Sequence, residues 1–325
     1  MEKTNVKKSK GTAIFAKYAT VFCLLAVFVI FVFGTNNFRF IQPDNLLNIL
    51  RQVSILAVVA LGVTFAMASG EFDMSTGSVV GLGCVLAMGL ISGQNLSPGV
   101  AILLVLLMGA GVGALNAAIT TLTRIPSIIV TLGMQSIVTG LVYMYSGGKA
   151  LYGTNPEIYA FIGQQSVGGI PFLVIIMLIF IVVTYFILNK TLIGRYIYAT
   201  GGNDQTARLS GINTRKYKFF AMMICSIFSA FAGILLAARL GSGQPTAGDT
   251  YTMEAMSAVF IGMTTIRVGR ANVLGTIVGV FLLGILSNGL NLMGWQYFLQ
   301  DMAKGAVMIA AVAISASRTE LKFFK

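Results

Sequence analysis

Residues 189–218 of this chain read NKTLIGRYIYATGGNDQTARLSGINTRKYK, a long polar stretch between two hydrophobic segments. The stretch contains one acidic residue, Asp204, and six basic residues: Lys190, Arg195, Arg208, Arg215, Lys216 and Lys218. Lys and Arg beside membrane spans are retained on the cytoplasmic side. The stretch therefore predicts both a membrane protein and its orientation.

The middle of this stretch has the composition of a short helix. Asn203 is a favourable N-cap, and Asp204 suits the positive start of a helix. Gly211 fits the left-handed residue that ends many helices. We expect a helix over residues 203–210 at the inner membrane surface, although composition alone fits a plain surface connector equally well.

The composition of the whole chain is that of an integral membrane protein. Of its 325 residues, 56% are hydrophobic and 10% are charged, whereas soluble domains carry about 25% charged residues. The 37 glycines suit helices that pack closely in lipid. The formal net charge of +12 does not indicate nucleic acid, because the basic residues lie in short loops between apolar runs.

Chemistry based on cysteine or histidine is not indicated. Cys23, Cys84 and Cys225 lie in apolar segments without a pairing pattern, so we expect buried, small hydrophobic side chains. The chain contains no histidine, which excludes histidine acid–base and metal chemistry. No catalytic group and no metal site is predicted.

Apolar runs of about 17–25 residues predict an all-α polytopic protein with ten spans. The expected spans are 14–33, 47–68, 75–92, 99–122, 127–145, 171–188, 219–240, 253–266, 272–290 and 298–316. The eighth is short and could be tilted or re-entrant. Close packing of helices is predicted at the small-xxx-small pairs Gly77/Gly81, Gly109/Gly113 and Gly275/Gly279.

An even number of spans places both termini on one side, and both are basic. We expect the tails 1–13 and 317–325 and the loop 189–218 in the cytoplasm, with the chain in the bacterial plasma (inner) membrane. The Lys and Arg residues that fall elsewhere are Arg39, Arg51, Lys149, Arg239 and Lys304. The basic start resembles a signal peptide, but no cleavage pattern follows at residues 34–36, which favours an uncleaved span.

Channels, secondary carriers, intramembrane enzymes and the membrane half of ATP-driven pumps all fit such a chain. Glu71 and Asp73 sit at a span boundary rather than in mid-span, where proton relays lie. Asp301 and Lys304 share a helix face and can neutralise each other. The sequence has no phosphate-binding loop, so another subunit would have to bind any ATP.

Four stretches resemble the permease subunits of ribose-type (monosaccharide) ABC importers, in the branched-chain/ribose permease superfamily, over essentially the whole chain. They are GEFDMSTGS at 70–78; Asn116 with Pro126 and TLG at 131–133; GRY, GGN and ARLSGI at 194–196, 201–203 and 207–212; and RLGSGQPTAG at 239–248. Glu71-Phe72 and residues 262–271 depart from the family pattern and leave the sugar open. The resemblance implies a type II ABC importer-like permease fold, as a single domain over 1–325.

The resemblance also implies a division of labour among subunits in a lipid membrane. An extracytoplasmic binding protein delivers a small neutral sugar, and a second permease copy or homologue completes the path. A cytoplasmic ATPase binds ATP and Mg, so this chain is not an enzyme and holds no cofactor. A nucleoside or another small polar solute is the alternative cargo, and an ATP-independent secondary carrier is the alternative class.

In such a complex, residues 203–212 are expected to couple the permease to the ATPase. Leu209 and Ile212 are apolar residues on a polar loop, which suits a groove on that partner. The residues assigned to coupling are Arg195, Asn203, Arg208, Leu209, Gly211 and Ile212.

The translocation path is predicted from polar residues within spans. Ser127, Thr131, Gln135 and Thr139 recur every four residues and form a stripe on one helix face. The same stripe could instead be polar glue between helices. The residues assigned to the path are Asn116, Thr131, Gln135, Thr139, Asn288 and Asn291, and those assigned to binding-protein docking on the outer loops are Arg39, Lys149, Arg239 and Asp249.

Overall fold

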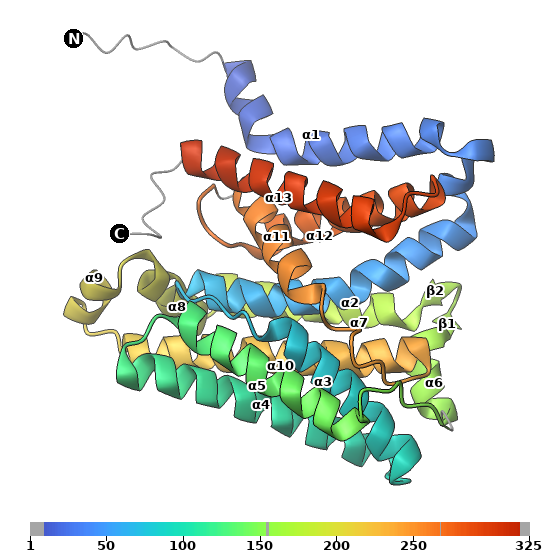
Figure 1. Cartoon of the computed structure of the whole chain (residues 1–325). Helices are drawn as coiled ribbons and strands as arrows, with labels where there is room; N and C mark the ends of the chain where they lie inside the picture. The colour runs from blue at the N-terminus through green and yellow to red at the C-terminus, as the bar shows by residue number, and fades with distance from the viewer. Residues whose placement is uncertain (1–9, 154–155, 267, 319–325) are drawn as a thin grey trace.

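The computed structural model describes residues 10–153, 156–266 and 268–318, which are almost entirely helical (Figure 1). The first elements are α1 (Lys10–Gly34), the 3-10 helix η1 (Asn36–Ile41), α2 (Pro43–Ala68), α3 (Thr76–Met88), the π-helix η2 (Gly89–Gly93), α4 (Pro98–Thr123) and α5 (Ser127–Ser146). In the middle lie α6 (Glu157–Gln164), β1 (Ser166–Val167), β2 (Ile170–Pro171), α7 (Phe172–Lys190), α8 (Leu192–Gly202) and α9 (Asp204–Leu209). The last are α10 (Thr214–Leu240), α11 (Tyr251–Met263), α12 (Val273–Leu292) and α13 (Tyr297–Arg318).

The predicted all-α polytopic fold is confirmed. Among the described residues, seven helices are each long and apolar enough to cross a membrane: α2, α3 continued by η2, α4, α5, α7, α10 and α12. Helices α1, α11 and α13 coincide with the other three expected spans, and α11 has only 13 residues, as the short eighth run indicated. The tails 1–13 and 317–325 lie mostly outside the described residues.

Two details of the sequence expectations need correction. The loop 146–170, expected on the outer side, contains a short helix, α6, and a two-stranded antiparallel hairpin of β1 and β2. Cys84 and Cys225 are buried as predicted, but Cys23 is exposed. Cys23 lies on α1, which packs mainly on α12 and leaves its other face uncovered.

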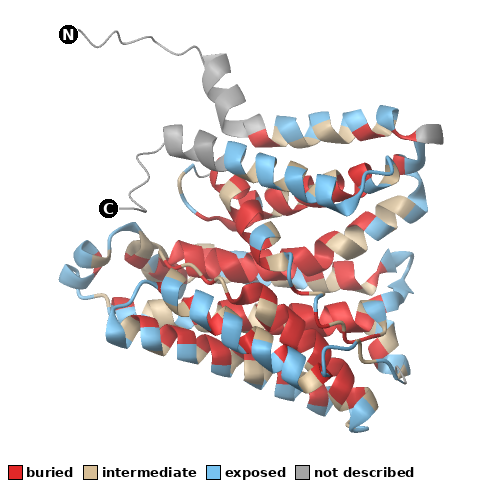
Figure 2. Ribbon diagram, viewed as in Figure 1, coloured by how far each residue is buried: buried red, intermediate tan, exposed pale blue. Residues whose placement is uncertain are grey.

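The centre of the bundle is formed by the two long helices α2 and α10, which contact each other. α10 also packs against α3 and α4, whereas α2 packs against α7, α11 and α12. All residues from 53 to 69 are buried (Figure 2). A helix that is apolar all round is stable only in such a surrounded position.

The same order of elements occurs twice along the chain. α2, an irregular segment at 69–75, α3, α4 and α5 are followed later by α10, an irregular segment at 241–250, α11, α12 and α13. The starts of the two short helices meet inside the bundle, where the N–H of Gly77 donates a hydrogen bond of 2.8 Å to the Thr252 hydroxyl. The 69–75 break and the start of α11 are therefore in contact inside the bundle, where irregular backbone at membrane depth finds its hydrogen bonds.

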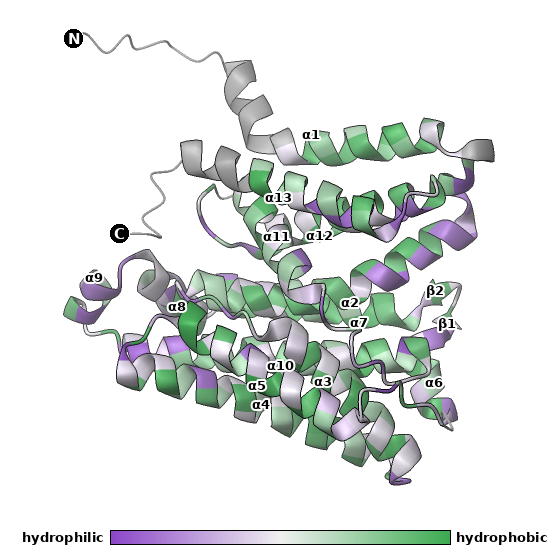
Figure 3. Ribbon diagram, in the orientation of Figure 1, coloured by the Kyte–Doolittle hydropathy of each residue, from purple (hydrophilic) through white to green (hydrophobic). Residues whose placement is uncertain are grey.

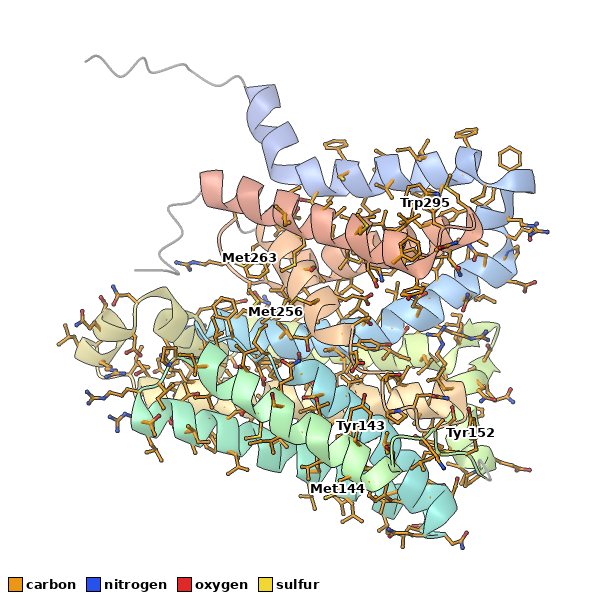
Figure 4. The ribbon with its side chains drawn as sticks, viewed as in Figure 1. Tyr143, Met144, Tyr152, Met256, Met263 and Trp295 are labelled. Atoms are coloured by element: carbon orange, nitrogen blue, oxygen red, sulfur yellow. The ribbon has the colours of Figure 1, made fainter. Side chains whose placement is uncertain are left out.

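The two ends of the bundle differ. α8 and α9 lie at one end, and α6 with the hairpin lies at the other (Figure 1). Hydrophilic residues gather at these ends and the flanks between them are apolar (Figure 3). Tyr143, Tyr152 and Trp295 lie toward the hairpin end (Figure 4). Tyr and Trp are typical of the membrane–water interface, so the bundle crosses the membrane from the α9 end to the hairpin end.

Glycines allow the closest helix contacts, and the predicted pairs occur at these contacts. Gly109 and Gly113 of α4 face Ala230 and Ser226 of α10. Gly275 and Gly279 of α12 face Gly262 and Ala258 of α11, and Gly77 and Gly81 of α3 face the 241–250 segment. The prediction of small-xxx-small packing is confirmed.

Gly109→Ala should lower the stability of the protein. A Cβ at residue 109 would lie 2.5 Å from the Ala230 Cβ and 2.9 Å from the Ser226 carbonyl oxygen, and overpacking costs about 1–3 kcal/mol. Gly111 is on the same helix with no atom within 4 Å of its Cβ position, so Gly111→Ala is the matched control. Thermal unfolding in detergent measures both variants, and equal melting temperatures would contradict the packing described.

Candidate coupling surface and translocation face

The predicted short helix is present as α9, and its own sequence caps both ends. Asn203 Oδ1 accepts a hydrogen bond of 2.9 Å from the N–H of Thr206, which is an N-cap. Gly211 has a φ of +80°, and its N–H donates to the Arg208 carbonyl at 2.9 Å. The N–H of Ile212 donates to the Ala207 carbonyl at 3.0 Å. These two bonds form a Schellman motif, so the local prediction for residues 203–211 is confirmed.

A second helix, α8, precedes α9 and was missed from the sequence. Its N-cap is Thr191, whose hydroxyl accepts a hydrogen bond of 3.3 Å from the N–H of Gly194. Ile197 and Thr200 are buried, and the Tyr198 hydroxyl donates to the Ala271 carbonyl at 2.9 Å. The signal that could have revealed α8 is a threonine N-cap followed by an apolar residue at helical spacing.

α8 and α9 border a hollow at this end of the bundle. Its volume is about 510 Å³, and its lining includes Arg195, Asn203, Ile212 and, from the segment before α12, Arg270. Leu209 is not part of this lining and is 91% exposed. The structure thus brings the predicted coupling residues together around one short helix, with Leu209 free to enter a groove on a partner.

The charges of α9 are connected to the interior by ion pairs. Arg208 Nη2 lies 2.6 Å from Asp204 Oδ2, and Arg208 Nε donates to the Thr214 hydroxyl at 2.9 Å. Lys218 Nζ on α10 lies 2.7 Å from Glu71 Oε1 and 3.7 Å from Asp204 Oδ1. Glu71 is 7% exposed. Lys218 therefore joins α9 to the 69–75 break.

The 69–75 break is held by hydroxyl groups of α5. The N–H of Phe72 donates to the Ser127 hydroxyl and the N–H of Met74 donates to the Thr131 hydroxyl, each at 3.0 Å. Thr131, assigned to the path from the sequence, is fully buried in this contact. Its position shows a structural function for the start of the polar stripe on α5.

Asp73 is a fully buried acid within the break. Its carboxylate accepts hydrogen bonds from the backbone N–H and the hydroxyl of Ser75, and from the Ser226 hydroxyl at 3.3 Å. Asn116 Nδ2 of α4 donates to the Ser75 hydroxyl at 3.0 Å. A buried charge requires such donors. Asn116, another residue assigned to the path, thus faces this interior network.

The remaining residues assigned to the path lie in two places. Gln135 and Thr139 are half-buried on α5, and the part of the chain that the structure describes offers neither side chain a hydrogen bond. Asn288 is buried and exchanges two amide hydrogen bonds of 3.0 and 2.9 Å with Asn45 at the start of α2. Asn291 is exposed at the end of α12. Gln135 and Thr139 therefore keep polar groups that are free to bind a solute.

The residues assigned to docking do not share one surface. Arg39 and Lys149 are exposed at the hairpin end. Arg239 is half-buried, and its Nη2 donates to Asn48 Oδ1 at 3.3 Å. Asp249 is exposed next to the buried Gly248, which packs against α3.

Known proteins match most of the chain. A family model described as "Branched-chain amino acid transport system / permease component" matches residues 45–312. The "Ribose import permease protein RbsC" of Haemophilus influenzae is 37% identical over 289 residues, covering 88% of this chain and 89% of the relative. RbsC of Escherichia coli K12 is 35% identical over 295 residues (90% and 92%), and its "D-allose transport system permease protein AlsC" is 31% identical over 311 residues (95% and 94%). No solved structure matches the chain.

Lys218→Met should destabilise the protein more than the double change Glu71→Gln/Lys218→Met. The single change leaves the Glu71 carboxylate buried without a cation, and breaking a buried pair costs about 3–5 kcal/mol; because Lys218 is partly exposed, we expect a loss below this range. The double change removes both charges. Melting temperatures in detergent measure the difference, and equal losses for the single and double variants would show that the pair is not energetically coupled.

Proposed function

Because the chain belongs to the family of branched-chain amino acid transport system permease components, we propose that it moves a small neutral sugar across the plasma membrane. The observation that carries the sugar assignment is the set of relatives that match nearly the full chain and are named for ribose and D-allose import. The family membership confirms the resemblance predicted from the four motifs.

The chain is a transport subunit rather than an enzyme. Its relatives are permease subunits of ABC importers, in which a separate ATPase hydrolyses ATP. In our proposal the complete transporter also contains an extracytoplasmic sugar-binding protein and a second permease copy or homologue. Residues 1–325 act as one transmembrane domain, and ATP and Mg stay on the ATPase.

We place the α9 end in the cytoplasm, together with both termini. The basic residues of 189–218 support this orientation, because Lys and Arg near spans are retained inside. α9 then contacts the ATPase: its caps fix the helix, Leu209 provides an exposed apolar contact, and Arg195 offers a charge at the rim of the hollow. The hairpin end, with Arg39 and Lys149, faces the binding protein.

The sugar assignment is tested with the whole transporter. The chain, its ATPase and its binding protein are reconstituted in liposomes, and ATP-dependent uptake of radiolabelled ribose and D-allose is measured. We expect uptake of at least one of these sugars and none without ATP. A transporter that hydrolyses ATP in response to its binding protein but moves neither sugar would contradict the proposed cargo.

Leu209→Asp should uncouple ATP hydrolysis from transport. An acid at this position would bury an uncompensated charge in the apolar groove of the ATPase. We expect loss of ATP-dependent uptake, with normal membrane insertion, because residue 209 is exposed in the isolated chain. Leu209→Met keeps the apolar contact and is the control. Normal uptake by Leu209→Asp would exclude this residue from the ATPase contact.

A further inference from the structure

Charged side chains gather where α11 and α13 meet, within predicted spans. Lys304 Nζ lies 2.6 Å from Glu254 Oε1 and 3.5 Å from Asp301 Oδ1. The Asp301 side chain is 55% exposed. Charged side chains within spans face the protein interior or a water-filled cavity and mark solute pathways. The α11–α13 face is therefore in contact with water or with another protein surface rather than with lipid tails.

Two hollows lie on either side of this ion pair and share Glu254 and Lys304. The first, of about 200 Å³, lies between α2, α11, α12 and α13, and its lining includes Gln52, Tyr251 and Ser287. The second, of about 340 Å³, is lined by Met253 and Met308 as well as by acids. Figure 1 shows these four helices next to one another in the part of the bundle that holds α13. The first hollow is the polar one.

The first hollow presents hydrogen-bonding groups that have no partner within the described residues. Ser287 is only 7% exposed, yet its hydroxyl makes no hydrogen bond to any residue within the described ranges. The same is true of the Gln52 amide and the Tyr251 hydroxyl. By contrast, the buried Ser54 hydroxyl of α2 donates to the Leu50 carbonyl at 2.7 Å. Buried polar groups are nearly always hydrogen-bonded, so the unpartnered hydroxyl of the buried Ser287, beside the half-buried Gln52 and Tyr251, indicates a polar ligand in this hollow.

We propose that this hollow is a binding subsite for a neutral polyhydroxy solute on the translocation path. The proposal rests on the proposed function. A sugar hydroxyl both donates and accepts hydrogen bonds, as the hydroxyl of serine does. The Glu254 carboxylate accepts, the Lys304 ammonium donates, and Gln52 and Ser287 can do both. Glu254 and Lys304 neutralise each other, which favours a neutral solute, and the ring of Tyr251 offers a face for the apolar side of a sugar.

The subsite extends the path predicted from the sequence to the second half of the chain. α5, which carries Gln135 and Thr139, contacts α3, and α13, which carries Lys304, contacts α11. These two pairs hold equivalent places in the repeated order of elements. The polar groups of α5 and α13 therefore hold equivalent places in the two halves of the chain.

The test measures whether a thiol reagent reaches a cysteine in the hollow and whether sugar slows that labelling. Ser287→Cys is made in a background with Cys23, Cys84 and Cys225 changed to serine, within the complete transporter. A small, water-soluble thiol reagent should label this thiol, and a high concentration of ribose or D-allose should slow the labelling. An equal concentration of glycine betaine should not. Gln94→Cys, at an exposed position between η2 and α4, is the control whose labelling sugar should leave unchanged.

Uptake provides the second measurement. Ser287→Ala and Gln52→Leu should each lower the rate of sugar uptake about 2- to 10-fold, as expected for one neutral hydrogen bond, while stimulation of the ATPase by the binding protein stays normal. Ser54→Ala removes a paired hydroxyl away from the hollow and should transport at the wild-type rate.

Each outcome decides for or against the subsite. No labelling of Ser287→Cys, or labelling that sugar does not slow, would overturn it, and Gln52→Cys gives the same readout if Ser287→Cys does not assemble. Wild-type uptake by both Ser287→Ala and Gln52→Leu would also overturn it while leaving the proposed function intact. A wild-type transporter that moves neither sugar would instead remove the proposed function on which the subsite depends.

Discussion

Backbone groups that leave a helix inside a membrane must find their hydrogen bonds within the protein, and this bundle depends on meeting that constraint twice. At the 69–75 break the N–H groups of Phe72 and Met74 are satisfied by hydroxyls of α5, and just beyond it the N–H of Gly77 is satisfied by Thr252. Because each donor needs a hydroxyl within hydrogen-bonding distance, α3, α5 and α11 are drawn together. The glycines at these contacts make the approach possible.

The constraint also explains why the polar stripe on α5 divides into two parts. The four-residue stripe on α5 predicts either a path or polar glue between helices. The structure divides it: Ser127 and Thr131 hold the break, whereas Gln135 and Thr139 remain half-buried without hydrogen bonds in the described part of the chain. A spacing of four residues identifies the helix face, but the partners of that face come from other segments and are not encoded in the spacing.

Features that depend on neighbours in sequence were therefore predictable, and features that depend on distant segments were not. The caps of α9 at Asn203 and Gly211, the apolar runs and the glycine pairs are local patterns, and the structure confirms them. The ion pair between Lys218 and Glu71 joins α10 to the 69–75 break, and the hollow at Ser287 lies between four helices. No periodicity relates such residues. Glu71 replaces a glycine of the ribose-permease pattern, yet its partner became evident only from the fold.

A series of contacts connects α9 with the proposed subsite. From α9, Asp204 leads to Lys218 and Glu71, and the break that holds Glu71 leads through Gly77 to Thr252. Two residues later on the same helix lies Glu254, in the wall of the hollow. Such a chain carries coupling only if some part of it has two stable arrangements. The 69–75 break is where the fewest helical hydrogen bonds would have to change, because two of its backbone N–H groups are held by side-chain hydroxyls that can exchange partners. In the proposed transporter, the 69–75 break is therefore the place where a movement of α9 would reach the proposed subsite.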